Sequence, residues 1–160
     1  SREWRSMFTL SVSLDVNPEG AAPKLTAHQV WQGLVMKAEN GALFVPSIRS
    51  CTVLERDATG LLREIVIGED RFQEKIAFTP EVEVLFERVG TAANAGWITN
   101  VVSEGPHGLL LTFTFAVNLP GAAPGSAQER ERGMAMRASY VGAVEATLAR
   151  VRALVKEGKV

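Results

Sequence analysis

The sequence predicts an α+β fold in which a seven-stranded antiparallel sheet wraps around a long C-terminal helix. Seven segments have strand character, and the last six follow one another up to Val117 over short connections marked by Gly, Pro, Asn or Asp. Short connections indicate antiparallel pairing, because a parallel pair needs a crossover of about a dozen residues or more. A helical pattern then runs from Ser126 to about Glu157, and its apolar side is available to cover the apolar face of the sheet.

The composition is that of one globular domain, which we assign to residues 7–157. Of the 160 residues 46% are hydrophobic, and the formal net charge is -1 with acids and bases interspersed. No basic stripe is present to neutralise phosphates, so we expect no nucleic-acid partner. No apolar stretch approaches the ~20 residues that span a bilayer, so we expect a soluble protein without membrane insertion. Cys51 is the only cysteine, which fits a reducing cytoplasm, and residues 1–6 are interpreted as upstream residues or residues added for expression.

The first strand and the first helix have clear local patterns. Residues 8–16 alternate apolar and polar side chains, which is typical of a half-buried strand. Thr26 and Gln29 have the spacing of a capping box, and apolar residues then recur at helical spacing. Gly41 is expected to end this helix in the left-handed conformation of a C-terminal cap. Residues 42–46 form a second, shorter apolar turn before the sheet resumes.

Six further strands are predicted at 50–56, 61–67, 71–78, 81–89, 97–104 and 108–117. Taking Glu69-Asp70 as a two-residue turn places Ile65 opposite Glu74 and makes Arg63 a diagonal neighbour of Glu74. Taking residues 79–81 as a three-residue turn places Phe86 opposite Glu74 in the next strand. The apolar face therefore continues across these three strands, whereas neither face of 97–104 is clearly apolar and its orientation stays open.

The last helix opens with Ser126 and Glu129 at the spacing of a second capping box. Projected at helical spacing, its apolar residues form one wide side, and Arg137 lies within that side. The helix is predicted to run unbroken to about Glu157.

Arg63 and Glu74 stand out because they share a face with large apolar side chains. A ligand cavity explains this placement, since apolar pockets carry a few polar groups that orient the ligand, and an ion pair lessens the cost of burying charge. The alternative is that the pair lies at the rim of the sheet, where a long arginine stays hydrated. The residues predicted to contact a ligand are Arg63, Ile65, Glu74, Ile76, Phe78, Val84, Phe86, Phe113, Arg137, Tyr140 and Val141.

Three segments give the chain a family resemblance: LTAHQVWQGLVMKAENGALFVPSIRSC (25–51), LLREIVIGEDRFQEKIAF (61–78) and MAMRASYVGAVEATL (134–148). With the order strand, two helices, six strands and long helix, they resemble the START or birch-pollen-allergen (Bet v 1-like) superfamily, SRPBCC, and within it the AtaL-like branch. The resemblance implies a helix-grip fold with a cavity that holds small, mostly apolar molecules. Plant members carry a glycine-rich loop where residues 55–60 have a single glycine, which argues against a phosphate-cradling role for that loop.

The remaining chemical signals are weak. His28 and His107 have no Cys, His or acidic partner at ligand spacing, so we expect no metal site and no cofactor. Tyr140 is interpreted as a core tyrosine or as a donor to the ligand. Trp97 is interpreted as core or pocket wall.

Two functions from different classes follow from the cavity. The first is binding or carriage of a small, mostly apolar ligand, such as a lipid, polyketide or aromatic metabolite, without catalysis. The alternative is a polyketide cyclase or aromatase-like enzyme, in which Glu74 is the candidate base and Arg63 assists it. Self-association through the outer face of the sheet is a third interpretation, and the oligomeric state is not set by any of these patterns.

Overall fold

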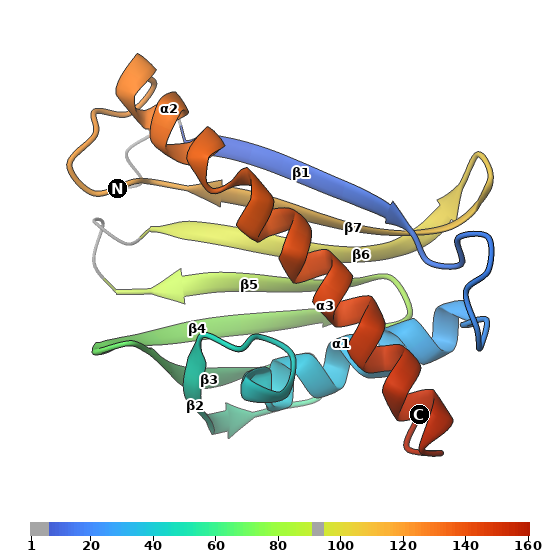
Figure 1. The fold of residues 1–160 in the computed structure, drawn as a ribbon. Helices are drawn as coiled ribbons and strands as arrows, with labels where there is room; N and C mark the ends of the chain where they lie inside the picture. Colours follow the sequence, from blue (N-terminus) through green and yellow to red (C-terminus); the bar gives the residue numbers. More distant parts are fainter. Residues whose placement is uncertain (1–6, 91–94) are drawn as a thin grey trace.

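The computed structural model describes residues 7–90 and 95–160, so the interpretation of residues 1–6 lies outside the described residues. Seven strands form one antiparallel sheet in the order β1-β7-β6-β5-β4-β3-β2 (Figure 1). The strands are β1 (Phe8–Asp15), β2 (Ile48–Arg56), β3 (Gly60–Ile67), β4 (Asp70–Thr79), β5 (Glu83–Val89), β6 (Gly96–Gly105) and β7 (Gly108–Val117). This confirms the predicted sheet.

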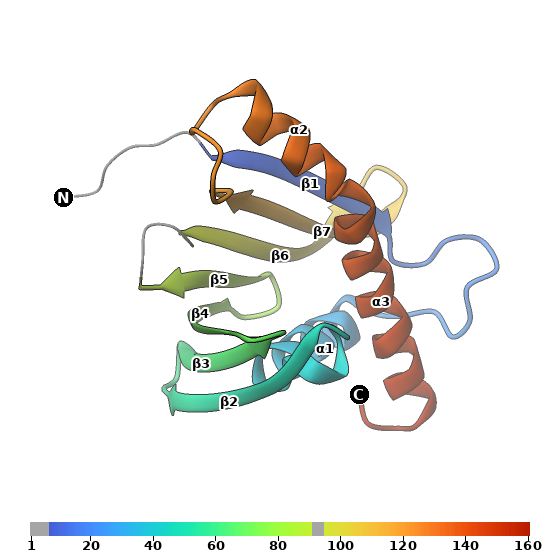
Figure 2. The same cartoon turned by 60° about the vertical axis from the view of Figure 1, so that its left-hand side comes forward.

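Helices cover the concave face of the sheet. They are α1 (Ala27–Glu39), the short 3-10 helix η1 (Gly41–Leu43), α2 (Ala127–Ala135) and α3 (Arg137–Lys156). α3 crosses the sheet diagonally and packs on β1, β7 and α1, while α1 packs near β2, β5 and β6 (Figures 1 and 2). The sheet curves around these helices, as the helix-grip arrangement predicts, and η1 is the second of the two helical pieces between the first strands.

The register of the β3–β4 hairpin differs from the prediction by two residues. Ile67 pairs with Asp70, so the turn is Gly68-Glu69, and Arg63 lies directly opposite Glu74. The reason is Gly68, whose φ of 61° suits the first central position of a two-residue hairpin turn. A shift of two residues keeps every side chain on its predicted face, because side chains alternate with a period of two.

The predicted register of the β4–β5 hairpin is also wrong by two residues. Thr79 pairs with Glu83 and Ile76 with Phe86, so the turn contains residues 80–82. Glu81 in this turn has a φ of 67°, and the Val82 amide donates to the Thr79 carbonyl at 3.0 Å. The backbone closes the turn at these positions, and the apolar faces again match.

The orientation that the sequence left open for 97–104 is decided by the pairing of β6. Asn100 lies opposite the buried Val84 and Phe113, so Ile98, Asn100 and Val102 point to the inner face. A fully buried asparagine on this face is the reason that neither face looked apolar.

The C-terminal helix is divided at Met136 rather than unbroken. Met136 has a φ of -90° and a ψ of 0°, and its amide bonds back to Gly133 and Met134 in a tightened turn. Gly133 lies against the ring of Phe8, where a Cβ atom would come within 2.4 Å of the ring. The two helical segments together still form the long cover that was predicted.

The capping box of α1 is present and gives a first prediction. Thr26 Oγ1 accepts from the Gln29 amide at 3.1 Å, and Gln29 Oε1 accepts from the Thr26 amide at 2.9 Å. We expect Thr26→Ala to lower the free energy of unfolding by about 1 kcal/mol, because the Gln29 amide at the start of the helix loses its acceptor, Thr26 Oγ1. Chemical denaturation measures this, with Gln32→Ala at an exposed position of the same helix as the control. Equal stabilities of the two variants would contradict the prediction.

Candidate functional site

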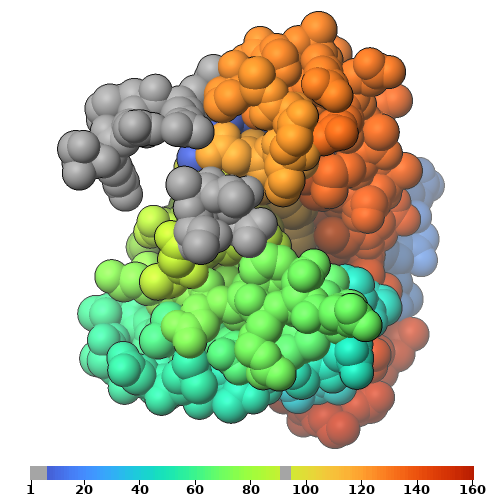
Figure 3. Space-filling view, turned by 90° about the vertical axis from the view of Figure 1, so that its left-hand side faces the viewer, coloured from blue at the N-terminus to red at the C-terminus, as the bar shows by residue number. Residues whose placement is uncertain are grey.

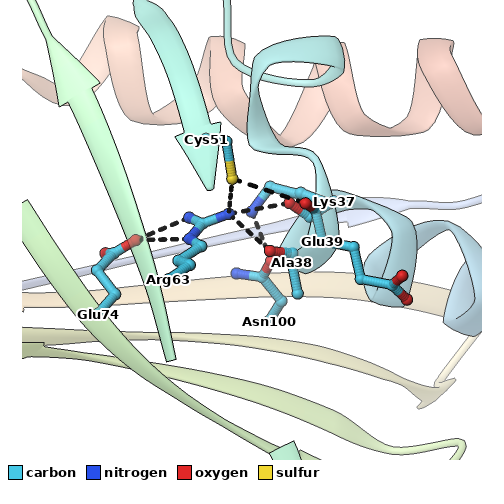
Figure 4. A network of polar contacts seen from close by, with 7 residues as sticks. All are labelled: Lys37, Ala38, Glu39, Cys51, Arg63, Glu74 and Asn100. Carbon is cyan, nitrogen blue, oxygen red and sulfur yellow. Dashed lines mark hydrogen bonds and ion pairs between the residues drawn. The ribbon is translucent and has the colours of Figure 1, made fainter. Parts of the chain in front are cut away.

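Four polar side chains lie buried on the inner face of the sheet, beneath α1. Lys37 comes from α1, Arg63 from β3, Glu74 from β4 and Asn100 from β6, and each is less than one-tenth exposed. We call these four residues the inner polar cluster; Figure 4 shows them converging between the sheet and the end of α1. Such burial requires partners for every charge, so their contacts define what the cluster does.

Arg63 and Glu74 form a buried ion pair. Arg63 Nε and Nη2 donate to Glu74 Oε1 at 3.0 and 2.8 Å. Both side chains are about 5% exposed, which rules out the alternative of a hydrated pair at the rim. The carboxylate oxygen Oε2 takes no part in this pair.

The remaining guanidinium nitrogen of Arg63, Nη1, caps the C-terminal end of α1. Nη1 donates to the carbonyl oxygens of Lys37 and Ala38 at 3.0 and 3.1 Å (Figure 4). These carbonyls belong to the last turn, where a cation is favoured by the helix dipole. Gly41 does not adopt the expected left-handed conformation. It instead leaves room for Arg63, because a Cβ atom at Gly41 would lie 2.9 Å from Nη1.

Lys37 and Asn100 are the two members of the cluster that the sequence analysis missed. The Nζ atom of Lys37 donates to Asn100 Oδ1 at 2.9 Å and lies 4.6 and 4.8 Å from the ring centres of Phe86 and Phe113. Burial, and secondly the positive charge of Arg63, lower the pKa of the amine from 10.5 to about 7, while the charge of Glu74 opposes this. The available signal was spacing, because Lys37 falls three residues after Leu34 on the apolar side of α1.

Asn100 leaves a buried donor without a partner. Its Oδ1 accepts from Lys37, whereas Nδ2 has no hydrogen-bond partner among the described residues. A buried donor without a partner costs about 1–3 kcal/mol. Binding of an acceptor oxygen next to Asn100 Nδ2 is therefore favoured.

A small pocket of about 40 Å³ lies at the end of the inner face, next to the ion pair. Its walls are Glu74, Phe86, Arg88, Ala95, Gly96, Trp97, Ile98, Val117 and Asn118. Arg88 on β5 lies directly opposite Glu74 on β4 in the strand register. Its guanidinium lies over the ring of Phe72, 4.1 Å from the ring centre. Figure 3 views this end of the molecule and shows a recess between α2 and the β3–β4 strands. Arg88 is a third residue that the sequence analysis missed.

A larger depression of about 450 Å³ lies elsewhere, beside the junction of β2, β3 and β4. It is open to solvent and lined by such residues as Glu55, Asp57 and Lys75. Its walls include neither Arg63 nor Glu74, so the small inner pocket is the one that adjoins the cluster.

The other predicted ligand contacts fall into three groups. Ile65, Ile76, Val84, Phe86 and Phe113 are buried on the inner face. Phe78 is half-buried against Trp31, at 6.1 Å between ring centres, and Tyr140 stacks on Phe115 at 3.9 Å. Val141 is half-buried and Arg137 is exposed at the start of α3. Contact of these residues with a ligand stays a prediction.

Tyr140 contributes a hydroxyl on the helix side of the interior. Burial raises its pKa, although the charge of Arg88 lowers it in part. The hydroxyl lies 3.8 Å from Met136 Sδ, a weak acceptor. It is therefore held as a neutral phenol, which is able to donate a hydrogen bond.

Within residues 7–90 and 95–160, the His, Cys, Asp and Glu side chains form no group of three that could hold a metal ion. None of the described helices has the length and apolar character needed to cross a membrane.

The sheet and the helices that cover its inner face define a helix-grip domain. The chain belongs to the family described as acetylaranotin biosynthesis cluster protein L (AtaL), whose model matches residues 10–158. Acetylaranotin biosynthesis cluster protein L from Aspergillus terreus (strain NIH 2624 / FGSC A1156) is 25% identical over 153 residues, which are 94% of this chain and 92% of that protein.

Solved structures of distant sequence share the fold. The aromatase/cyclase Zhui from Streptomyces sp. R1128 is similar with a TM-score of 0.66 at 15% identity, over 93% of this chain and 96% of that one. Ara h 8.0201 has a TM-score of 0.60 at 13% identity, over 91% and 98% of the two chains. A START superfamily protein from Mycobacterium smegmatis has a TM-score of 0.60 at 16% identity, over 92% and 98%.

Proposed function

We propose that this protein binds a small, mostly apolar molecule with one polar end and carries it chemically unchanged. The bound molecule would lie between the inner face of the sheet and α3. The observation that supports this most is the pocket beside the inner polar cluster. Apolar walls at Phe86, Ile98 and Val117 meet two charged groups, Glu74 and Arg88, at one position. That mixture is typical of sites that hold an apolar ligand and orient it by a few polar contacts. The single cysteine favours the reducing cytoplasm as the place of action.

The pocket must widen to take a ligand. Its volume of about 40 Å³ accepts a group of about the size of a water molecule, whereas small-molecule sites measure about 300–1,000 Å³. Arg88 and Phe72 are half-buried at this end of the sheet, where long side chains move at the smallest cost. We therefore propose entry past Arg88, whose charge suits an anionic or strongly polar ligand end.

A fluorescent probe with this character tests the proposal. We expect 1-anilinonaphthalene-8-sulfonate to bind the folded protein at one saturable site, and Ile98→Trp to weaken binding by about tenfold or more by filling the pocket. Val101→Trp is the matched control, because Val101 is half-buried on the same strand but points to the outer face. The proposal fails if both variants bind like the parent protein, or if Val101→Trp weakens binding equally.

A second candidate function is a cyclase or aromatase-like activity in the same place. The observation that favours it is the Glu74 carboxylate, which lines the pocket while Arg63 fixes it at 2.8 Å. In this mechanism Glu74 removes a proton from an activated methylene, and Arg63 and Lys37 stabilise the enolate oxygen. The solved structures of similar fold include proteins titled as aromatase/cyclases.

Turnover distinguishes the two functions. A synthetic poly-β-keto thioester incubated with the protein is recovered unchanged if the protein is a carrier. If it is a cyclase, mass spectrometry detects the loss of water, and that loss disappears in Glu74→Gln, which keeps the shape of the side chain but cannot accept the proton.

A further inference from the structure

The Lys37 amine is a buried nucleophile that ligand carriage does not require. Among the described residues its hydrogen-bond partner is the neutral Asn100, and no carboxylate lies within ion-pair distance of it. The rings of Phe86 and Phe113 flank it at 4.6 and 4.8 Å, which keeps water away. A lysine that serves stability alone ordinarily extends its charged end into solvent.

The groups around Lys37 hold much of the amine in its neutral form. The charged residues that face it are Arg63 from β3 and Glu74 from β4, while β5, β6 and β7 present Phe86, Asn100 and Phe113. Burial and Arg63 together bring the pKa of the amine to about 7. Near neutral pH a large fraction therefore carries a free electron pair, and a desolvated lysine of this kind is the usual nucleophile toward carbonyl groups.

Asn100 adds a donor beside this nucleophile. Its Nδ2 is fully buried and has no acceptor among the described residues, although its Oδ1 is only 2.9 Å from Lys37 Nζ. When an amine adds to a carbonyl carbon, the carbonyl oxygen gains negative charge and becomes a hydroxyl. A hydrogen bond donated by Asn100 Nδ2 would stabilise that oxygen. The pocket shares Phe86 and Glu74 with the surroundings of Lys37, so the approach to the amine starts from the pocket.

We propose that Lys37 attaches a small apolar aldehyde or ketone through an imine. The Nζ electron pair attacks the carbonyl carbon, and the electrons of the C=O double bond move to oxygen, which takes up a proton. The resulting carbinolamine loses water as the C=N bond forms, so that amine and carbonyl give imine and water without oxidation or reduction. This inference rests on the proposed binding function and narrows its ligand to carbonyl compounds.

Reductive trapping with a defined probe tests the proposal on the intact parent protein. Propanal and sodium cyanoborohydride at pH 7 convert an imine into a stable N-propyl lysine, which peptide mapping locates. We expect Lys37 to be labelled at least about tenfold faster than the exposed Lys24 and Lys75, because an ordinary lysine keeps less than about one-thousandth of its amine neutral at pH 7. The rate of labelling at Lys37 should rise to half its maximum near pH 7.

Two variants sharpen the test. Asn100→Leu should slow labelling of Lys37 by about tenfold or more through loss of the donor to the oxygen, and Lys37→Met should remove this one labelled peptide. Because mapping of the parent protein decides the question, a variant that folds poorly does not obscure it. Labelling of Lys37 that is absent, or no faster than at Lys24 and Lys75, overturns the proposal.

The failure of the imine and the failure of ligand binding are distinguishable. Saturable binding of 1-anilinonaphthalene-8-sulfonate without labelling at Lys37 overturns the imine alone. Labelling at Lys37 without a saturable probe site supports the imine and overturns the wider apolar-ligand proposal. Preincubation with the probe should slow labelling if both hold, because the two share one entrance.

Discussion

Glu74→Ala is expected to lower the free energy of unfolding by about 3–5 kcal/mol, the range found when one partner of a buried ion pair is removed. The substitution leaves the Arg63 guanidinium about 5% exposed with no opposing charge. It also removes the charge that raises the pKa of Lys37, so the neutral form of that amine is favoured further. Urea denaturation followed by circular dichroism at pH 7 measures the loss.

The same hairpin offers a matched control. Glu64 and Arg71 form an ion pair at 2.8 Å, but the Arg71 side chain is 67% exposed. Glu64→Ala should change the stability by less than about 1 kcal/mol, because solvent screens an exposed pair. If Glu74→Ala proves no more destabilising than Glu64→Ala, the buried pair does not hold α1 and the sheet together as described.

The second large effect is a change in the pH dependence of stability in Lys37→Met. In the folded protein the pKa of Lys37 is about 7, against 10.5 for the ordinary amine. Between these pH values the unfolded chain binds a proton at Lys37 that the folded chain does not. The contribution of Lys37 is therefore fully present above pH 10.5 and falls by about 1.4 kcal/mol for each pH unit down to about pH 7.

The measurement compares the parent protein with Lys37→Met by denaturation at pH 7, 8 and 9. Groups common to both proteins cancel, so the difference in unfolding free energy should shift by roughly 2 kcal/mol in favour of the parent between pH 7 and pH 9. Lys75→Met at an exposed position should show a difference that is nearly independent of pH. A constant difference for Lys37→Met as well would mean that the amine is protonated in the folded state.

Arg63 and Glu74 illustrate which structural features the sequence pattern predicts correctly and which it does not. Their alternation with apolar residues correctly placed both on the inner face, and the structure confirms their burial at 4% exposed each. Both hairpin registers were nevertheless wrong by two residues, because local turn geometry at Gly68 and Glu81 fixes the closing pair. A register error of two residues leaves each side chain on its correct face of the sheet, but it assigns the wrong cross-strand neighbours.

Lys37 and Asn100 illustrate what a chain pattern misses. A lysine within an amphipathic helix is ordinarily read as part of its solvated side, and an asparagine in a strand as an interruption of the apolar face. Only the crossing of α1 over β6 brings Nζ of one within 2.9 Å of Oδ1 of the other. The two residues are 63 positions apart, and no spacing in the chain encodes this contact.

The sequence by itself determined the α+β class, the order of the elements, the faces of most strands and the resemblance to the AtaL family. Periodicity and turn chemistry, which decide the first three, act over a few residues. Only the tertiary structure decided that Arg63 caps α1 and that the pocket lies beside Arg88. It also decided that Lys37 is desolvated, which lowers the pKa of its amine. Those properties depend on desolvation and on distances between elements far apart in the chain. Both are set when the helices pack against the sheet.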